Sequence, residues 1–317
     1  MQNVLVTGAN GFIGRALCDH LSIQSVRVRG AVRSLPSNKK NIDYCIVDFE
    51  RDLDLSQLCE GVDYIVHLAG RAHILNDHHH DPQQAFRTIN CEASFRLARQ
   101  AVRSGVKRFI FLSSIGVNGS QTSSCPFDES SVANPMTPYA RSKFEAEQGL
   151  EEIFRSTDSE LVIIRPPLVY GLDAPGNFSR LLKLIRLPVP LPLGRIRNLR
   201  SLVSLENMVE FIRLCLGHPG AVGRVFLISD GVDVSTSEIV AALSEGMGRK
   251  KFLFHVPNFI FKAVAKLVDR ENLYTQLYCS LQVDTSLARR LLGWTPLGHP
   301  YANLRDIGRQ YRDRYSA

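Results

Sequence analysis

Ser114, Tyr139 and Lys143 are the side chains whose types and spacing best suit the transfer of a proton to or from a substrate oxygen. Tyr139 and Lys143 lie four positions apart in a segment that opens with Thr137-Pro138, so we expect both on one face of a helix. A phenol has an ordinary pKa of about 10, and a nearby ammonium lowers it by favouring the phenolate. We therefore predict that Tyr139 exchanges the proton while Ser114 hydrogen-bonds the same oxygen.

A tyrosine and a lysine at this spacing occur by chance on many helices, so the elements around them decide their meaning. Ser113-Ser114 follows an apolar run, Phe109–Leu112, that we expect to be a buried strand. A long amphipathic helix is expected from Asp81-Pro82 to Val102. Strands that alternate with helices predict an α/β Rossmann fold with a doubly wound parallel sheet. The other predicted strands are Val4–Val6, Val26–Val32, Tyr44–Val47, Asp63–Leu68 and Leu161–Ile164.

Three glycines, Gly8, Gly11 and Gly14, join the first predicted strand to a helix over Arg15–Leu21. Gly8 permits a tight turn, Gly11 lets a pyrophosphate approach the backbone, and Gly14 lets the helix lie close to the sheet. The helix N-terminus adds free N–H groups and a partial positive charge. The segment therefore predicts a dinucleotide site, and the small Leu68-Ala69-Gly70 at another strand end leaves room for it.

Two further strand ends bear on the kind of dinucleotide. The second predicted strand ends in Val32-Arg33-Ser34, with no carboxylate to hold a ribose 2′-hydroxyl and with a guanidinium that suits a 2′-phosphate. We therefore favour NADP(H) over NAD(H), although Arg33 is also compatible with an ordinary surface arginine. Asp48-Phe49 follows the third strand, where Asp48 either accepts from the adenine amino group or belongs to a turn.

The composition shifts after Gly171. Pro175–Phe178 and the proline-rich Leu187–Gly194 are expected to break regular structure, and the arginines that follow suit a diphosphate. Phe226–Ser229 is predicted to rejoin the main sheet. We therefore predict a Rossmann domain over 1–165, rejoined by 200–230, and a smaller, interleaved C-terminal α/β substrate domain over 166–199 and 231–317. The amphipathic helix Asn258–Val268 is expected to pack onto the substrate domain rather than to contact a membrane.

Composition excludes several other classes. The 317 residues are 44% hydrophobic and 22% charged, with a net charge of +7, seven cysteines and no Cys-x-x-Cys pair. No dense basic run with interleaved aromatics indicates nucleic acid, and no apolar run is long enough for membrane insertion, so we expect a cytoplasmic protein that binds small anions. His78-His79-His80 is interpreted as a solvated loop, and no metal site is predicted.

Several motifs together resemble the extended short-chain dehydrogenase/reductases, the NAD-dependent epimerase/dehydratase family. They are Thr7–Gly14, Leu68-Ala69-Gly70, Ser113-Ser114, Tyr139-x-x-x-Lys143 and Arg165–Gly171, in family order over nearly the whole chain. The resemblance implies a cofactor across the strand ends and Ser114, Tyr139 and Lys143 as catalytic residues, with Lys143 also holding the nicotinamide ribose. Asn90 falls where the family has an asparagine that supports the site.

The predicted cofactor-binding residues are Gly8, Asn10, Gly11, Phe12, Ile13, Gly14, Arg33, Asp48, Phe49, Leu68, Ala69, Gly70, Tyr139, Lys143 and Pro166. Predicted substrate contacts, by resemblance to nucleotide-sugar enzymes, are Ser114, Asn177, Leu193, Gly194 and Arg200. The family's usual Val-Tyr-Gly is Val117-Asn118-Gly119 here, a change that the sequence does not explain. Members of the family dimerise through the helices that carry Phe95 and Phe144 here. By analogy, a homodimer is expected.

The residues after Ser114 separate the activities that the resemblance implies. Dehydratases resemble Thr-Asp-Glu there, whereas this chain has Ser114-Ile115-Gly116 and lacks the extra acid and base. We predict reduction at C4 of a UDP-4-keto-6-deoxy-N-acetylhexosamine for a surface polysaccharide such as O-antigen. The alternative is a UDP-hexose or UDP-N-acetylhexosamine 4-epimerase. A ketone reductase of another substrate class and a non-catalytic nucleotide-binding subunit are less favoured.

Overall fold

The computed structural model describes residues 2–24, 26–37, 42–72, 82–250, 252–267 and 271–315. Its central element is a seven-stranded parallel sheet with the strand order β3-β2-β1-β4-β5-β6-β9. This order confirms the predicted doubly wound Rossmann-like fold. The strands are β1 (Asn3–Thr7), β2 (Arg27–Val32), β3 (Asp43–Ile46), β4 (Tyr64–His67), β5 (Arg108–Leu112), β6 (Glu160–Arg165) and β9 (Arg224–Leu227).

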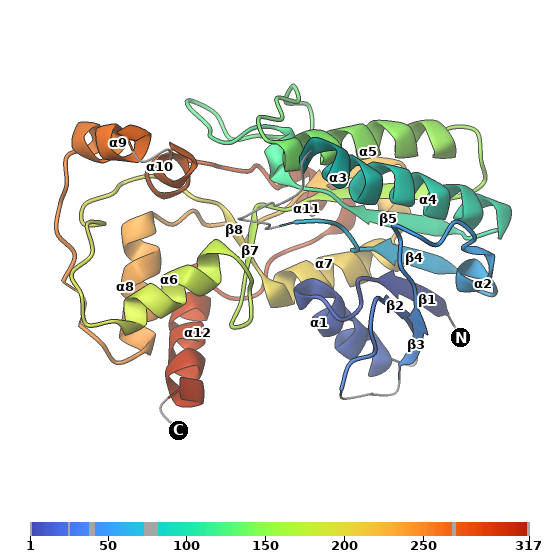
Figure 1. Ribbon diagram of the computed structural model, residues 1–317, viewed down its shortest axis with the longest axis horizontal. Helices are drawn as coiled ribbons and strands as arrows, with labels where there is room; N and C mark the ends of the chain where they lie inside the picture. Colours follow the sequence, from blue (N-terminus) through green and yellow to red (C-terminus); the bar gives the residue numbers. More distant parts are fainter. Residues whose placement is uncertain are drawn as a thin grey trace.

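Helices cover both faces of this sheet, which is why its strands read as continuous apolar runs. On one face, α1 (Phe12–Ser22) and α7 (Leu205–Gly217) pack on Val4 and Val6 of β1. On the other face, α4 (Ala93–Arg103), α5 (Pro138–Phe154) and the short α2 (Ser56–Cys59) pack around Leu5 (Figure 1). The two buried layers hold the carboxyl ends of the strands in fixed register.

The helix predicted to run up to Val102 is interrupted. It is divided into α3 (Pro82–Arg87), a π-helical turn over Thr88–Glu92, and α4. A π-turn inserts one extra residue into the helical repeat and is common at functional sites. Here the turn contains Asn90, which is fully buried. Asp81, the predicted start of the helix, and the histidines His78-His79-His80 lie outside the described residues.

A second, smaller unit surrounds two short parallel strands, β7 (Leu168–Tyr170) and β8 (Leu202–Ser204). Residues 200–204 were predicted to rejoin the main sheet, but β8 pairs with β7 instead, and the return occurs through α7 and β9. The prediction of irregular structure at Asn177-Phe178 is also wrong, because α6 begins at Asn177. The helices of this unit are α6 (Asn177–Arg186), α8 (Thr236–Gly246) and α12 (Pro300–Tyr315), whereas α11 (Ser286–Leu292) packs beside β9 in the main sheet's core.

A buried carboxylate ties the two units together. Asp230, just beyond β9, accepts hydrogen bonds from the Tyr170 hydroxyl at 2.6 Å, the Asn207 amide at 2.7 Å and the Ser204 backbone N–H at 3.0 Å. These three groups belong to β7, to α7 and to the junction of β8 with α7. The hydrogen bonds fix the smaller unit against the carboxyl edge of the main sheet.

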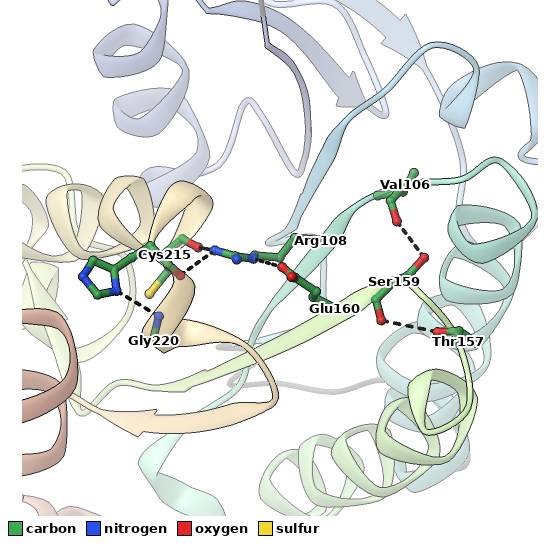
Figure 2. Close-up of polar contacts among 8 residues, drawn as sticks. Val106, Arg108, Thr157, Ser159, Glu160, Cys215 and Gly220 are labelled. Atoms are coloured by element: carbon green, nitrogen blue, oxygen red, sulfur yellow. Dashed lines mark hydrogen bonds and ion pairs between the residues drawn. The ribbon is translucent and has the colours of Figure 1, made fainter.

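The opposite edge of the sheet has a separate polar anchor (Figure 2). Arg108, at the start of β5, donates to Glu160 of β6 at 2.6 Å and to the carbonyl oxygens of Cys215 and His218 at the end of α7. On the same edge, the Ser159 hydroxyl donates to the Val106 carbonyl at 2.6 Å. This buried arginine therefore joins two strands and a helix far from any site at the carboxyl ends.

Two helices lie at the periphery of the smaller unit, α9 (Asn258–Leu267) and α10 (Glu271–Tyr278) (Figure 1). The predicted packing of α9 onto the substrate domain holds for one side only, because Phe259 and Leu267 are exposed. Its predicted last residue, Val268, lies outside the described residues. Nowhere in the described part of the chain is a helix both long and apolar enough to cross a membrane.

Candidate active site

A cavity of about 1070 Å³ lies at the carboxyl ends of the strands. That volume exceeds the roughly 300–1,000 Å³ of a pocket for one small molecule. One side, here called the sheet wall, consists of strand ends and the helices that follow: Gly8, Gly11–Gly14, Leu68, Gly70–Ala72, Leu112–Gly116, Tyr139 and Lys143. The other side, here called the outer wall, consists of Pro175, Asn177, Arg180, Arg200, Asn272, Leu273, Thr275, Gln276 and Leu281.

The glycine loop on the sheet wall has the shape that its sequence predicts. Gly8 has a φ of 66°, and a Cβ on Gly14 would lie only 2.2 Å from the Gly8 carbonyl oxygen. Gly11 precedes the first helical residue of α1, and no side chain caps that end. The first N–H groups of α1 are therefore free to bind an anion in the cavity.

Beneath this loop, a chain of hydrogen bonds links Thr7 to Asn90, and the sequence analysis missed it. Ser94 donates to the Asn90 carbonyl at 2.8 Å, so it accepts from Nε2 of His67 at 2.9 Å. Nδ1 of His67 therefore accepts from the Thr7 hydroxyl at 2.7 Å, and Thr7 in turn accepts from the Ala69 N–H at 3.0 Å. Burial lowers the pKa of His67 to about 3, which keeps the ring neutral.

The side chain of Asn90 fixes the strand-end loop after β4. Its Oδ1 accepts from the Arg71 N–H at 2.8 Å, while its Nδ2 donates to the Arg71 carbonyl at 3.2 Å and to the Ser142 hydroxyl at 2.9 Å. A Cβ on Gly70 would lie 3.0 Å from that Oδ1 and 3.4 Å from the Lys143 ammonium. Asn90 therefore joins the β4 loop to the helix that carries the predicted catalytic pair.

Tyr139 and Ser114 meet at the cavity. Tyr139 lies in the first turn of the predicted helix, α5, and Thr137 caps this helix by accepting from the Ala140 N–H at 3.1 Å. Burial raises the pKa of Tyr139 to about 12, and a hydrogen bond with Ser114 acts in the opposite direction. We expected the Lys143 ammonium to lower this pKa, but loss of hydration at the buried phenol raises it instead.

Lys143 is buried one helical turn beyond Tyr139. Its ammonium donates to the Leu112 carbonyl at 2.8 Å and lies 4.5 Å from the centre of the Phe111 ring. Burial lowers the pKa of Lys143 to about 8, against the opposing attraction of Glu147. The ammonium retains two donors beyond the Leu112 bond, so it can hold a second acceptor in the cavity.

Asn118, which the sequence left unexplained, has a structural role here. Arg165 forms a buried ion pair with Glu147 at 2.6 Å and donates to Oδ1 of Asn118 at 3.1 Å. Nδ2 of Asn118 donates to the carbonyls of Asp128 and Ser131, each at 3.4 Å. The asparagine thus ties the loop beside the cavity to the end of β6, a contact that sequence spacing alone does not reveal.

On the outer wall, the structure brings together only part of the predicted substrate set. Arg200 and Asn177 line the cavity; Asn177 hydrogen-bonds Gln276, and Arg200 donates to the Cys279 carbonyl at 3.2 Å. Burial lowers the pKa of Arg200. Leu193 and Gly194 lie outside the cavity wall, and Gly194 instead donates its N–H to the Phe254 carbonyl at 3.0 Å. Sequence analysis did not single out Arg180, Asn272 and Thr275.

Several predicted cofactor contacts also lie outside the cavity wall. Asp48 accepts from the Glu50 N–H at 3.0 Å within a turn, and Arg33 is exposed just after β2. Asn10 reaches the Ser34 carbonyl at 3.5 Å, which places the glycine loop beside the end of β2. Pro166 lines the cavity, whereas Phe49 and Ala69 are not part of its wall.

The sheet wall fits a dinucleotide. The glycine loop and the uncapped end of α1 suit its phosphates, and Lys143 has donors for a ribose. The Ser113 hydroxyl, buried in this wall, has no hydrogen-bond partner among the described residues. A buried hydroxyl without a partner is costly unless a bound group satisfies it, so its position indicates a polar ligand at this wall.

Comparison with known proteins identifies related chains. Residues 4–229 match the model of the NAD dependent epimerase/dehydratase family. A UDP-glucose 4-epimerase of Vibrio cholerae is 38% identical over 298 residues, which cover 93% of this chain and 91% of that relative. The N-acetyl-α-D-glucosaminyl-diphospho-ditrans,octacis-undecaprenol 4-epimerase of Escherichia coli O157:H7 is 29% identical over 81% of this chain and 76% of its own length.

Solved structures agree with this fold. The crystal structure of the UDP-glucuronic acid 4-epimerase from Bacillus cereus with NAD superposes with a TM-score of 0.80 and 20% identity, covering 100% of both chains. At that identity the likeness concerns the fold alone.

Proposed function

Since the chain belongs to the NAD dependent epimerase/dehydratase family, we propose that it is a nucleotide-sugar 4-epimerase that uses a tightly held nicotinamide dinucleotide. The observation that carries this proposal is the meeting of Ser114, Tyr139 and Lys143 on one wall of a cavity whose other wall holds Arg200. The first three residues suit proton exchange at a sugar hydroxyl, and the arginine suits the diphosphate that carries the sugar.

Within that proposal each side chain has one task. A bound oxidised dinucleotide supplies a hydride acceptor and a positive charge. Ser114 orients the C4 oxygen, and Tyr139, as the phenolate that such a charge favours, takes the proton from it and later returns it. Lys143 holds its ammonium within the same wall, and Asn90 keeps that wall in place. Rotation of the sugar between the two transfers inverts C4.

A second candidate is the one-way reduction of a 4-keto sugar, with NADP(H) as the exchanged cofactor. The observation in its favour is the end of β2, where Arg33 is exposed and no carboxylate occurs between Ala31 and Ser34. A 2′-phosphate lying there has a guanidinium partner. The sequence analysis favoured this reduction, and we now place the epimerase first because the named relatives above are epimerases.

The group that carries the sugar is part of the proposal. The Vibrio cholerae relative takes its name from a UDP-sugar, whereas the Escherichia coli relative takes its name from a sugar on diphospho-undecaprenol. Both substrates present a diphosphate, which Arg200 and Arg180 on the outer wall suit. We propose the UDP-sugar as the substrate to test first.

The experiment is to release and identify any nucleotide from the purified protein and then to supply UDP-glucose and UDP-N-acetylglucosamine without added cofactor. The expected result is co-purified NAD and interconversion of the C4 epimers, followed by NMR. If the protein carries no cofactor and consumes NADPH with a 4-keto sugar in one direction, the reductase replaces the epimerase. Turnover of neither UDP-sugar nor 4-keto sugar contradicts both candidates.

A further inference from the structure

Helix α9 turns its apolar side to solvent. Phe259 is 74% exposed, Ile260 43% and Leu267 86%. The helix is held from the other side by Phe261, whose ring centre lies 4.6 Å from that of Tyr278 in α10. The side of α9 that packs on α10 is therefore already occupied, and the exposed apolar side chains lie on the other side.

The order of residues along α9 makes this a distinct face. Phe259, Ala263 and Leu267 recur every four residues and share one side of the helix, with Ile260 beside them. Lys262 and Lys266, both exposed, follow the edge of that side. An apolar stripe bordered by lysines is the pattern of a helix that lies in the interface of a membrane rather than across it.

Positive charge extends beyond the helix. Six basic residues and no acidic one occur between Ala174 and Leu205, and five basic residues and no acidic one occur between Arg249 and Val268. Because the whole chain has a net charge of only +7, the rest of it is net negative. The charge of this protein is therefore concentrated in two segments of the smaller unit.

The structure places these two segments side by side. Leu191 donates its N–H to the Phe252 carbonyl at 3.0 Å, and Phe254 donates to the Leu191 carbonyl at 3.1 Å. Phe252 is 70% exposed. Beside α9, a second cavity of about 610 Å³ is lined by Arg195, Arg197 and His255 among others, which suits a phosphate group. Exposed Phe252 and the cationic side chains of this second cavity thus lie on adjoining segments.

We propose that this surface docks the protein on a bilayer of anionic phospholipids. It is named here the docking face and comprises α9 with Arg195, Arg197, Phe252 and Phe254. The apolar side chains of α9 enter the boundary between headgroups and acyl chains, while the basic ones meet the lipid phosphates. A second copy of this chain fits less well, because a symmetric contact would bring the same positive charges together.

Docking has a consequence for the cavity. Leu273 and Asn272 of α10 line the outer wall, and α10 packs directly on α9. A bilayer against α9 therefore lies near one edge of the cavity. The inference concerns the location of the protein and is independent of the proposed reaction, because vesicle binding is measured without turnover.

The test is co-sedimentation of the full chain with vesicles of phosphatidylcholine, alone or with added phosphatidylglycerol, at low and high salt. We expect binding only to the anionic vesicles and its loss at high salt. The variants Phe259→Ser with Leu267→Ser, and Lys262→Glu with Lys266→Glu, should each weaken binding by roughly tenfold or more, since each removes one of the two attractions. Turnover of a water-soluble sugar nucleotide should not change.

Matched controls lie far from the docking face. Ile23→Ser removes an apolar side chain that is 83% exposed, and Arg99→Glu with Arg103→Glu reverses two exposed charges on α4; neither should alter vesicle binding. Phe259→Trp gives a readout that needs no destabilising change, because Trp294 is buried and the new indole should shift to the blue on anionic vesicles.

Three outcomes overturn the proposal: equal binding to neutral and anionic vesicles, no binding to either, or an unshifted indole at position 259. A dimer in solution that Phe259→Ser converts to a monomer would assign the face to a second copy instead. Failure of the proposed reaction with intact vesicle binding leaves this inference standing.

Discussion

The two walls of the cavity are built on different physical principles. On the sheet wall and directly behind it, the Lys143 ammonium, the Asn90 amide and the His67 ring are each fixed by hydrogen bonds to neighbouring groups. On the outer wall, Asn177 and Gln276 hydrogen-bond each other at the surface, and Arg200 reaches only a backbone carbonyl. One wall is rigid before any ligand arrives, whereas the other presents polar side chains with spare hydrogen-bonding capacity.

This difference indicates which part of the reaction each wall determines. A buried, fully hydrogen-bonded framework keeps a proton donor and an ammonium in place without rearrangement at the moment of reaction. Amides and arginines with spare hydrogen-bond donors adapt to the sugar and to its carrier, so they set which substrate binds. Changes to the sheet wall should therefore affect turnover or cofactor retention, and changes to the outer wall should affect substrate affinity.

The largest effect is expected from Tyr139→Phe, which removes only the phenolic oxygen. Turnover should fall by about 10²–10⁴-fold, the usual contribution of a positioned proton donor, while the thermal midpoint and the bound cofactor change little. Steady-state kinetics and quantitation of released nucleotide measure both. Tyr64→Phe, in β4 and outside the cavity wall, is the matched control. Unchanged turnover in Tyr139→Phe would remove this residue from the proposed chemistry.

The glycine loop should be nearly as sensitive. A methyl group at Gly14 would overlap the Gly8 carbonyl oxygen at 2.2 Å, so Gly14→Ala must displace the loop and should weaken cofactor binding by at least tenfold. Gly217→Ala is the control, because nothing lies within 4 Å of the added carbon at the end of α7. That variant should gain about 0.5–1 kcal/mol of unfolding free energy. Equal cofactor affinity in both variants would contradict the assignment.

On the outer wall, Arg200→Ala should raise KM for a UDP-sugar by roughly 10–100-fold, the loss expected for one charged hydrogen bond, and should leave kcat within a few-fold. Arg200→Lys should recover part of the affinity, although it cannot bind two oxygens as a guanidinium does. Arg197→Ala, exposed and outside this cavity, serves as the control. A fall in kcat with unchanged KM would contradict this prediction and would indicate that Arg200 acts in the reaction step rather than in substrate binding.

The smallest effect concerns stability and pH. Burial lowers the pKa of Lys143 from 10.5 to about 8. Below about pH 8 the buried charged form therefore lowers the free energy of unfolding. Between pH 8 and 10.5 the unfolded chain binds more protons than the folded one, and stability rises with pH from this group. Lys143→Met should therefore be more stable than the wild type at pH 7, with a gap that narrows above pH 8.

Thermal midpoints across this pH range measure that gap. The effect of Tyr139 on stability has the opposite sign, because burial raises its pKa to about 12. Its stabilising contribution therefore falls as the pH rises above 10. Only measurements below pH 10 report on Lys143 alone. A gap that stays constant between pH 7 and 10 would show that Lys143 is charged throughout.

Candidate catalytic residues and the glycine loop could be proposed from the sequence because the chemistry expected of them depends on short, local spacing. Gly8, Gly11 and Gly14 fall within the loop after β1 and the first turn of α1, and Tyr139 and Lys143 share one helix. The roles of the other residues around the cavity depended on hydrogen bonds to residues far away in the sequence. Asn118 pairs with Arg165, 47 positions away, and His67 joins Thr7 to Ser94 across 60 and 27 positions. No periodicity in the chain marks such contacts.

By itself, the sequence determined the α/β class and the parallel sheet, and it predicted a phosphate-binding loop and proton-transfer residues, because each follows from residue types over a few adjacent positions. Only the tertiary structure decided the pKa of Tyr139, the inclusion of Arg200 in the cavity without Leu193 and Gly194, and the outward apolar side of α9. Burial and proximity come from segments far apart in the chain, so they are properties of the packed molecule rather than of any local pattern.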